Sequence, residues 1–443
     1  MTFTPAFRSL RFAIVALASV AFAGHAHATK IERVVSPGGI EAWLVRDSSV
    51  PLISLEFAVK GGANQDPAVK PGVGYFTAGM LDEGAGDLDS SAFQQRLERN
   101  AIELRFRSQR DEFYGSVRVL TERKDEAFEL LRMSLTAPRF DAEPLERVRA
   151  QMMTALNRET TSPNDIASRL WWRTAFPNHP YGQPLNGTLE SVPLITADDL
   201  RDYTRRVITR ERLTVAVVGD IDPETLKTTL DKIFGSLPAK GDLRPSEPAV
   251  MADAGKSVFV DLDVPQAVVT FGGPGIARKD PDFIAAFIVN HILGGGSFSS
   301  RLYKEVREKR GLAYSIYTYL LPLNYTALIQ GGTATRSDRV NETQTLIHAE
   351  IKRLAEEGPT ADELEKSKSY LKGSYALNFD TSTKIASQLV QIQLDSLGMD
   401  YIDRRNGLIE AVTLADVKRV AKRLLDGGML FTVVGRAAKK EGG

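Results

Sequence analysis

Histidine is the first residue type to consider for metal or acid–base chemistry, and it is scarce here: the 443 residues include five histidines and no cysteine. The lack of cysteine excludes disulfides, thiolate zinc sites, iron–sulfur clusters and cysteine nucleophiles. His25 and His27 lie close to the N-terminus, which leaves His179, His291 and His348 for the body of the chain. None of these three lies one helical turn from another, as two imidazoles on one zinc require. We interpret His179 as a structural loop residue, His291 as a core or interface residue and His348 as a helix-surface residue, and we predict no metal site in this chain.

A glycine-rich segment offers a second kind of chemistry. It contains Gly294, Gly295, Gly296 and Ser297, and it joins two helical patterns. A nucleophile elbow needs a further glycine and a strand before the helix, and a phosphate-binding loop needs a lysine. The segment has neither feature, so it is either a flexible connection between helices or a loop that guides a ligand.

Arg307 and Tyr314 form a third candidate. A basic amphipathic helical pattern covers residues 300–310, ends near Gly311, and is followed by a strand. Arginine presents a planar, permanently charged fork, and tyrosine can donate a hydrogen bond. Together they could hold a peptide carbonyl or its oxyanion. The alternative is a solvated helix face beside a half-buried aromatic residue.

The elements that must position these residues occur twice along the chain. Phe57 and Phe271 lie in similar apolar, strand-like runs, and each run is followed by an Asp-Pro pair. Thr196 and Thr413 each open a helical pattern that leads to an apolar strand. The separation between the two threonines is nearly equal to the separation between the two phenylalanines. Pairs of similar segments this far apart rarely have nearly the same sequence separation by chance, so we infer two homologous domains.

Each repeat contains strands grouped with long helices, which predicts an α+β fold of two homologous α/β-sandwich domains. We place these domains at residues 29–235 and 256–443, joined by an exposed linker with several prolines and glycines at 236–255. The clearest predicted strands are 104–107, 113–120, 313–320 and 326–331. The clearest predicted helices are 125–137, 143–157, 339–357 and 360–378. Thr360 and Glu363 have the spacing of a capping box.

The N-terminal segment 1–28 is typical of a cleaved secretory signal peptide. Two arginines precede an apolar run, and Ala26-His27-Ala28 has the small-x-small pattern of a cleavage site. The run is short for a membrane span, so we predict an exported, periplasmic protein with no stable membrane insertion. The whole chain has 56 basic and 56 acidic residues, and cleavage removes two of the basic ones, leaving a formal net charge of −2. This balance gives no reason to expect a nucleic-acid partner.

Three features together resemble the insulinase/pitrilysin-type metallopeptidases, also called inverzincins. They are the twofold α+β repeat, the glycine-rich loop followed by the segment from Arg307 to Tyr314, and the His-Pro-Tyr-Gly loop at 179–182 followed by Asn-Gly-Thr at 186–188. The resemblance covers nearly the whole chain after the signal peptide.

The resemblance implies an H-x-x-E-H zinc motif on a helix of the first domain. Here the matching frame carries Tyr75 and Gly79 in place of the zinc histidines and Ala78 in place of the general base. A distant glutamate ligand is expected near residues 152–155, and no acidic residue occurs from 151 to 157. The frame has therefore lost all four functional groups. Arg307 and Tyr314, by contrast, match the family positions that hold the substrate carbonyl.

Some members of this family divide the work between two subunits, one with the zinc motif and one with the arginine and tyrosine. The resemblance thus implies a zinc-free subunit of a secreted heterodimeric metallopeptidase, inactive alone. Its partner would carry the zinc, its substrates would be peptides, and its glycine-rich loop would guide them. The alternative is a non-proteolytic periplasmic protein that binds peptides or supports an assembly, and a lone hydrolase of unusual chemistry is a third, weaker alternative.

Overall fold

The computed structural model describes residues 30–436, so the predicted signal peptide lies outside the described residues. The strands are β1 (Ile31–Val35), β2 (Glu41–Arg46), β3 (Leu52–Lys60), β4 (Glu103–Ser108), β5 (Glu112–Leu120), β6 (Leu213–Gly219), β7 (Ser257–Asp261), β8 (Gln266–Pro274), β9 (Ala313–Pro322), β10 (Ala327–Arg336) and β11 (Leu430–Gly435). The longer helices are α2 (Val73–Met80), α3 (Ser90–Arg99), α4 (Lys124–Thr136), α5 (Ala142–Glu159), α6 (Pro163–Ala175), α7 (Ala197–Val207), α8 (Pro223–Phe234), α9 (Phe283–Asn290), α10 (Val340–Glu357), α11 (Ala361–Gly373), α12 (Ser382–Leu394), α13 (Tyr401–Ala411) and α14 (Leu414–Leu425). Among residues 30–436, no helix has both the length and the apolar character that crossing a membrane would require.

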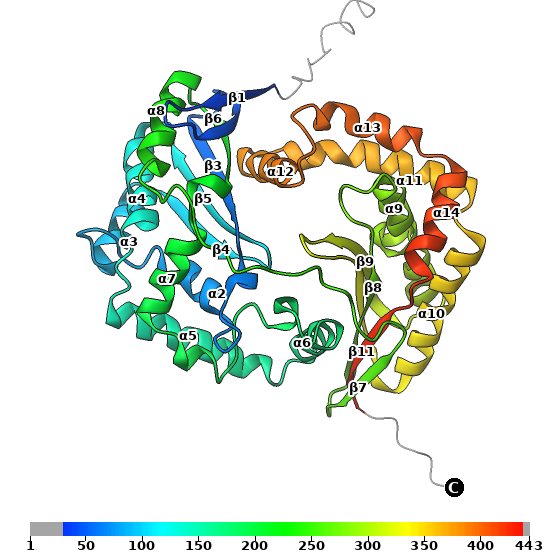
Figure 1. Cartoon of the computed structure of the whole chain (residues 1–443). Helices are drawn as coiled ribbons and strands as arrows, with labels where there is room; N and C mark the ends of the chain where they lie inside the picture. The colour runs from blue at the N-terminus through cyan, green and yellow to red at the C-terminus, as the bar shows by residue number, and fades with distance from the viewer. Residues whose placement is uncertain (1–29, 437–443) are drawn as a thin grey trace, which may run out of the picture.

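The strands form two mixed sheets, one in each half of the chain (Figure 1). The first has the order β1-β2-β6-β3-β5-β4, and the second has the order β7-β11-β8-β10-β9. In each sheet one pair is parallel, β2 with β6 and β7 with β11, and the other neighbours run antiparallel. The second sheet thus repeats the order of the first without its edge strand β1. The two α/β-sandwich domains predicted from the sequence repeat are confirmed.

One packing detail recurs in both sheets. Phe57 pairs across the strands with Gly115, and Phe271 pairs with Gly331. A Cβ atom on Gly115 would lie 2.2 Å from the Phe57 ring, and one on Gly331 would lie 2.5 Å from the Phe271 ring. Since such distances are far below contact, each ring requires a glycine opposite it. The repeat therefore keeps a phenylalanine together with its cross-strand glycine.

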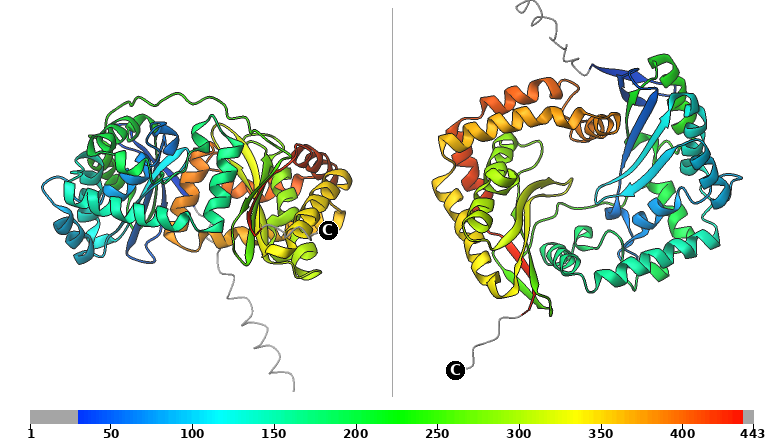
Figure 2. Two further views of the ribbon diagram at one scale, coloured as in Figure 1. Left: turned by 90° about the horizontal axis from the view of Figure 1, so that it is seen from below. Right: turned by 180° about the vertical axis from the view of Figure 1, so that it is seen from behind.

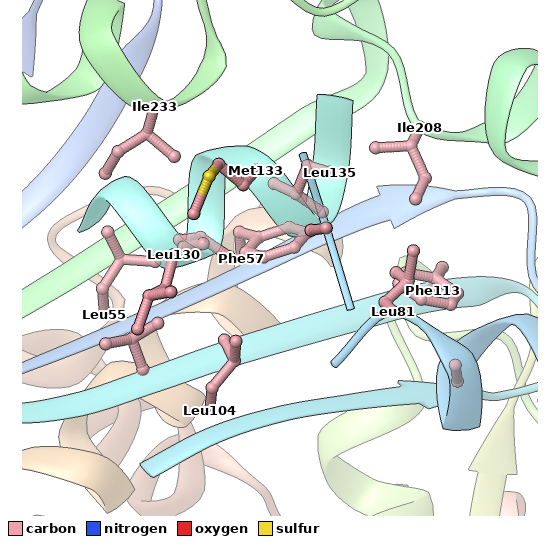
Figure 3. Packing of buried hydrophobic residues seen from close by; sticks show 14 of the residues in the cluster. Leu55, Phe57, Leu81, Leu104, Phe113, Leu130, Met133, Leu135, Ile208 and Ile233 are labelled. Carbon is pink, nitrogen blue, oxygen red and sulfur yellow. The ribbon is translucent and has the colours of Figure 1, made fainter. Parts of the chain in front are cut away.

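The core of the first domain lies between its sheet and the helices α4 and α8. Leu55 and Phe57 of β3 and Phe113 of β5 are fully buried there with Leu130 of α4 and Ile233 of α8 (Figure 3). Burying such side chains stabilises the folded state by about 25 cal/mol for each Å² of apolar surface removed from water. This layer holds the outer face of the sheet.

The inner face of each sheet is covered by a helix from the other half of the chain (Figures 1 and 2). Helix α6, from the first half, packs on β8 and β11 of the second sheet. Trp171 of α6 is fully buried and donates from Nε1 to the carbonyl of Leu430 at 3.1 Å. Thr432 of β11 donates from its hydroxyl to the carbonyl of Ala167 at 3.0 Å. These bonds anchor α6 on the second sheet.

Helix α12 makes the reciprocal contact, packing on β3 and β6 of the first sheet. Leu389 and Val390 form a buried cluster with Ala58 and Val218. Gln393 donates from Nε2 to the carbonyl of Val215 at 3.1 Å. The two halves therefore exchange equivalent helices, an arrangement that the amphipathic patterns alone did not predict.

Several local predictions are confirmed. The capping box predicted at Thr360 forms, and Thr196 and Thr413, which were predicted only to open helices, form capping boxes as well, since each threonine and the acid three residues later bond to one another's backbone N–H. The helix predicted over 360–378 is instead α11 followed by a 3₁₀ segment, Ser374–Phe379. The break falls after Gly373, a weak helix former. Strand β10 continues past the predicted end at 331 through Gly331 and Gly332.

The segment between the halves has no helix or strand from residue 238 to residue 256, yet it is anchored along its length. Leu237 and Ala249 are buried, and the Arg244 N–H donates to Gln65 Oε1 at 2.7 Å. The Ala249 N–H donates to the carbonyl of Tyr325 at 2.8 Å. Most of its side chains are exposed, and these contacts hold the segment against the protein surface where it runs from the first half to the second (Figure 2).

The turn between β9 and β10 docks on the turn between β4 and β5. The Asn324 N–H donates to Asp111 Oδ2 at 2.8 Å, and Asn324 Nδ2 donates to Glu112 Oε1 at 2.9 Å. The Tyr181 hydroxyl donates to Asp111 Oδ1 at 2.7 Å. Burial, and then the neighbouring charge of Asp111, raise the pKa of Glu112 to about 7. Two carboxylates and one tyrosine thus join the halves.

We expect Glu112→Gln to flatten the pH dependence of stability. Because the pKa of Glu112 is raised on folding, the folded state binds a proton between the unfolded value of about 4.3 and about 7, and the unfolded state does not. Stability contributed by this group therefore falls as pH rises through that window. Melting temperatures measured at several pH values between those limits should fall less for Glu112→Gln than for the unchanged protein. Equal slopes would contradict the assignment, and Glu122→Gln, at an exposed glutamate, controls for the lost charge.

Candidate functional site

Arg307 lies among three aromatic side chains. Its Cζ atom is 4.6 Å from the ring centroid of Tyr314, 4.8 Å from that of Tyr303 and 6.0 Å from that of Phe298. Within residues 30–436 the guanidinium makes no ion pair and no hydrogen bond. Tyr314 is 83% exposed. Arginine bound through its faces by aromatic rings keeps its N–H groups available for an acceptor.

The backbone fixes the positions of these residues. Arg307 lies in a π-helical turn, Tyr303–Glu308, a rare geometry that is frequent at functional sites. Gly311, at φ +60°, then reverses the chain into β9. The Thr335 hydroxyl donates to the carbonyl of Leu312 at 2.7 Å, which fixes the start of the strand beside Tyr314. The predicted order of helix, glycine and strand is therefore observed.

Two other basic side chains of this segment are already paired, whereas Lys304 makes no ion pair within residues 30–436. Lys309 donates from Nζ to Glu305 Oε1 at 2.6 Å, and Arg310 donates from Nη1 to Glu305 Oε2 at 2.8 Å. Ion pairing accordingly leaves Arg307 as the arginine of this turn that is available to a ligand.

The glycine-rich loop is packed against strand β9. A Cβ atom on Gly294 would lie 2.6 Å from Thr318 Oγ1 and 2.8 Å from the Thr318 nitrogen, and one on Gly295 would lie 2.7 Å from Asn290 Nδ2. Gly294 is buried, and it ends a π-helical turn, His291–Gly295, together with Gly295. Close packing thus supplies a reason for these glycines that needs no ligand. Ser297, at φ +47°, then carries the chain to Phe298, which is 69% exposed and faces Arg307.

We expect Gly294→Ala to lower the free energy of unfolding by about 1–3 kcal/mol, because the added methyl group has to displace the backbone of β9. Chemical denaturation measures the change. Gly407→Ala is the matched control: Gly407 lies within α13 with nothing within 4 Å of an added Cβ, so alanine should stabilise by about 0.5–1 kcal/mol. A neutral Gly294→Ala would show that the loop is freer than its contacts indicate.

The zinc-motif frame lies on helix α2. Tyr75 is 46% exposed, Ala78 is buried and Gly79 is exposed. A Cβ atom on Gly79 would meet only Val148 Cγ1, at an ordinary 3.5 Å, so packing does not exclude a larger residue there. Alanine and glycine have no ligand atom, and zinc prefers imidazole, thiolate and carboxylate donors. These residues therefore do not fit a zinc ion, and the described residues contain no group of three or more potential metal ligands.

A cavity of about 890 Å³ opens beside Tyr75. Glu159, two residues past the stretch without acids, lies in its wall at the end of α5. Its carboxylate accepts a hydrogen bond from Arg169 Nη2 and another from Asn186 Nδ2 at 2.7 Å. Both carboxylate oxygens of Glu159 therefore already have partners within the protein, and one of these partners is the positively charged Arg169. The cavity is lined by neither Arg307 nor Tyr314 nor the glycine-rich loop.

The three histidines have structural surroundings. His179 accepts at Nδ1 from the Tyr181 N–H at 3.1 Å, and its Nε2 lies 3.1 Å from the carbonyl of Glu247. His291 is 6% exposed, and its Nδ1 lies 3.0 Å from the Ser367 hydroxyl. His348 is on the exposed face of α10. The interpretations of His179 as a loop residue, His291 as a core residue and His348 as a surface residue agree with these positions.

The structure thus brings Arg307, Tyr314 and the end of the glycine-rich loop together, and it keeps Tyr75 apart from them in a separate cavity. Sequence reasoning missed Phe298 and Tyr303, although both lie shortly before Arg307 in the chain. An aromatic residue four positions before an arginine on a helix is the signal that could have identified Tyr303.

Comparisons with known proteins place the chain. Residues 43–189 match the family model described as insulinase (peptidase family M16), and residues 194–371 match the model described as the peptidase M16 inactive domain. The chain is 26% identical over 420 residues to an uncharacterized zinc protease of Streptomyces coelicolor, covering 93% of this chain and 91% of that protein. It is 28% identical over 333 residues to the non-peptidase homolog YmxG of Helicobacter pylori, covering 75% and 77% of the two chains.

Solved structures agree. The crystal structure of a peptidase M16 inactive domain from Pseudomonas fluorescens matches with a TM-score of 0.87 and 25% identity, over 92% of this chain and 98% of that one. The periplasmic protease PqqL from Escherichia coli shares the fold, with a TM-score of 0.78, 16% identity and 46% of that chain covered. Since two models of one family match successive parts of the chain and a solved member superposes along most of it, the predicted resemblance is confirmed: the chain belongs to the insulinase family of peptidases, family M16.

Proposed function

We propose that this protein is the zinc-free subunit of a heterodimeric, exported metallopeptidase, and that it supplies Arg307 and Tyr314 to the active site of a zinc-bearing partner. The observation that supports this proposal is one contrast. The frame at Tyr75, Ala78 and Gly79 lacks every zinc donor, whereas Arg307 is charged, free of ion pairs and held by aromatic rings.

The chemistry assigned to Arg307 follows from its surroundings. Hydrolysis of a peptide bond places negative charge on the carbonyl oxygen, and fixed donors aimed at that oxygen stabilise the transition state. The rings of Tyr303 and Tyr314 restrain the guanidinium before the substrate arrives, so little further ordering is needed during the reaction. The exposed Tyr314 hydroxyl supplies a second donor.

The partner carries the zinc ion and the general base, because this chain has neither in its frame. The names of the relatives include both zinc proteases and a non-peptidase homolog, as expected of a family with active and inactive chains. The predicted signal peptide at residues 1–28 and the fold shared with a periplasmic protease support a place in the periplasm.

The direct test combines the mature chain with an exported H-x-x-E-H relative from the same cell and measures cleavage of a peptide library. We expect cleavage by the mixture and by neither chain alone. Changing the partner's motif glutamate to glutamine should abolish it, which controls for contaminating proteases. Failure to bind any zinc-motif chain would overturn the proposal and favour the alternative of a non-proteolytic peptide-binding or assembly protein.

A further inference from the structure

The cavity beside Tyr75 contains a cation without an ionic partner. Arg110, at the turn between β4 and β5, stacks on Trp172 with its Cζ atom 3.5 Å from the ring centroid. Its Nη1 donates to the carbonyl of Tyr181 at 2.7 Å and lies 3.5 Å from that of Gln183. Within residues 30–436, Nε and Nη2 donate to no acceptor, and no carboxylate lies within 4 Å.

The carboxylates near Arg110 are committed elsewhere. Asp111 accepts hydrogen bonds from Asn64, Tyr181 and Asn324 at the junction of the two halves. Glu159 is held by Arg169 and Asn186 on the cavity wall. Burial lowers the pKa of Arg110 to about 10, so the guanidinium remains charged at neutral pH. The charge of Asp111 partly compensates that of Arg110 without a contact ion pair, and an incoming anion that contacts Nε and Nη2 would relieve the remaining cost of burial.

The rest of the wall suits a peptide. The volume of about 890 Å³ is much larger than a small anion needs and lies within the range of sites for organic ligands. Gln109 and Gln183 supply amides that can pair with peptide groups, and Ile166, Leu170 and Leu189 supply apolar surface. Asp165, Arg173 and Glu190 line the cavity as well, so the acidic and basic side chains of the wall balance in number. Arg173 also makes no ion pair within the described part of the chain but is exposed, so Arg110, which is partly buried and stacked on Trp172, distinguishes the site.

We propose that this cavity binds a carboxylate group of a peptide, with Arg110 as the anion receptor and Trp172 holding its guanidinium in place. The peptide character of the ligand rests on the proposed function, whereas the need for a carboxylate rests on Arg110 alone. The cavity would thus have exchanged the zinc chemistry of its family position for the binding of an acidic peptide end or side chain.

Binding to the isolated mature chain tests this proposal. The probes are N-acetylated tetra-alanine with a free carboxylate and the same peptide as its C-terminal amide, followed by calorimetry and by tryptophan fluorescence. Trp172 lines the cavity and packs against the buried Trp171 with ring centroids 5.2 Å apart, whereas Trp43 is buried in another cluster, so a fluorescence change reports on the pair of Trp171 and Trp172. We expect the acid to bind at least about tenfold more tightly than the amide. Equal binding of acid and amide, or no binding of either at millimolar concentration, would overturn the proposal.

Variants separate the contributions. Arg110→Gln should remove the preference for the acid, and Arg110→Lys should keep part of it, because lysine retains the charge without the planar fork. Arg173→Gln, at an exposed arginine of the same cavity, should leave the preference unchanged. Thermal melts check that each variant is folded. A preference that survives Arg110→Gln in a folded protein would overturn the assignment.

Further probes distinguish the source of the carboxylate. An amidated peptide with a central glutamate that binds as tightly as the acid would support a carboxylate site filled by an acidic side chain. Acetate binding as tightly as the peptide would overturn the peptide part of the proposal. These measurements need only the isolated chain, so failure here and failure of the heterodimer test can be told apart.

Discussion

Arg307→Ala should lower kcat/KM of the reconstituted peptidase by about 10²–10³, the usual cost of losing one donor to a developing oxyanion. Most of the loss should fall on kcat, because the interaction strengthens only as charge accumulates on the carbonyl oxygen. Arg307→Lys should recover a small part of the rate, since lysine keeps the charge without the planar fork held between the rings of Tyr303 and Tyr314.

Steady-state kinetics on the complex measure this effect, and Arg310→Ala is the matched control. Arg310 lies three residues away, is exposed, and pairs with Glu305 at 2.8 Å, so its loss should change the rate less than about twofold. A folded Arg307→Ala complex with full activity would show that the arginine has no part in the reaction. Binding of the two subunits has to be measured in parallel, so that a lower rate is not mistaken for dissociation.

Trp171→Ala should have the largest effect on stability, about 3–5 kcal/mol. The indole is fully buried between α6 and the second sheet, and its N–H bonds to the carbonyl of Leu430. A Cβ on Gly272 would lie 2.7 Å from the indole ring, which shows how closely the sheet approaches it. Truncation leaves a cavity and removes the hydrogen bond to the Leu430 carbonyl at the contact between the two halves.

Urea denaturation followed by far-ultraviolet circular dichroism measures the loss. Leu194→Ala, at a side chain that is 56% exposed, should change the free energy of unfolding by less than about 0.5 kcal/mol. A loss below about 1 kcal/mol for Trp171→Ala would mean that α6 contributes little to holding the second sheet.

Local signals in the sequence predicted the local structure. The threonines at 196, 360 and 413 identify helix starts because a capping box needs only residues three apart. The repeat predicted two like sheets because Phe57 and Phe271 keep the same surroundings in each. The missing zinc donors could also be located, since the frame at Tyr75 to Gly79 occupies one helical turn.

Contacts between distant segments could not be predicted in this way. The amphipathic patterns of α6 and α12 indicate that one face is buried, but not that the burying sheet belongs to the other half. Arg110 and Trp172 are far apart in the sequence, and only the fold places one on the other. The proximity of Arg307 to Tyr314 was expected from the family resemblance, whereas the contact with Phe298 depends on the path of the loop after Ser297.

The exchange of α6 and α12 constrains the order in which the molecule can be completed. Synthesis proceeds from the N-terminus, so the first sheet is made long before α12 exists to cover it. Until residues 382–394 are synthesised, the inner face of the first sheet, which includes Ala58 and Val218, is an exposed apolar surface prone to aggregation. Cleavage within residues 236–255 would yield two fragments. The first fragment would lack α12, which covers its sheet, and the second would lack α6, which covers its own. Such fragments are suited to complementation when present together, and to aggregation when made alone.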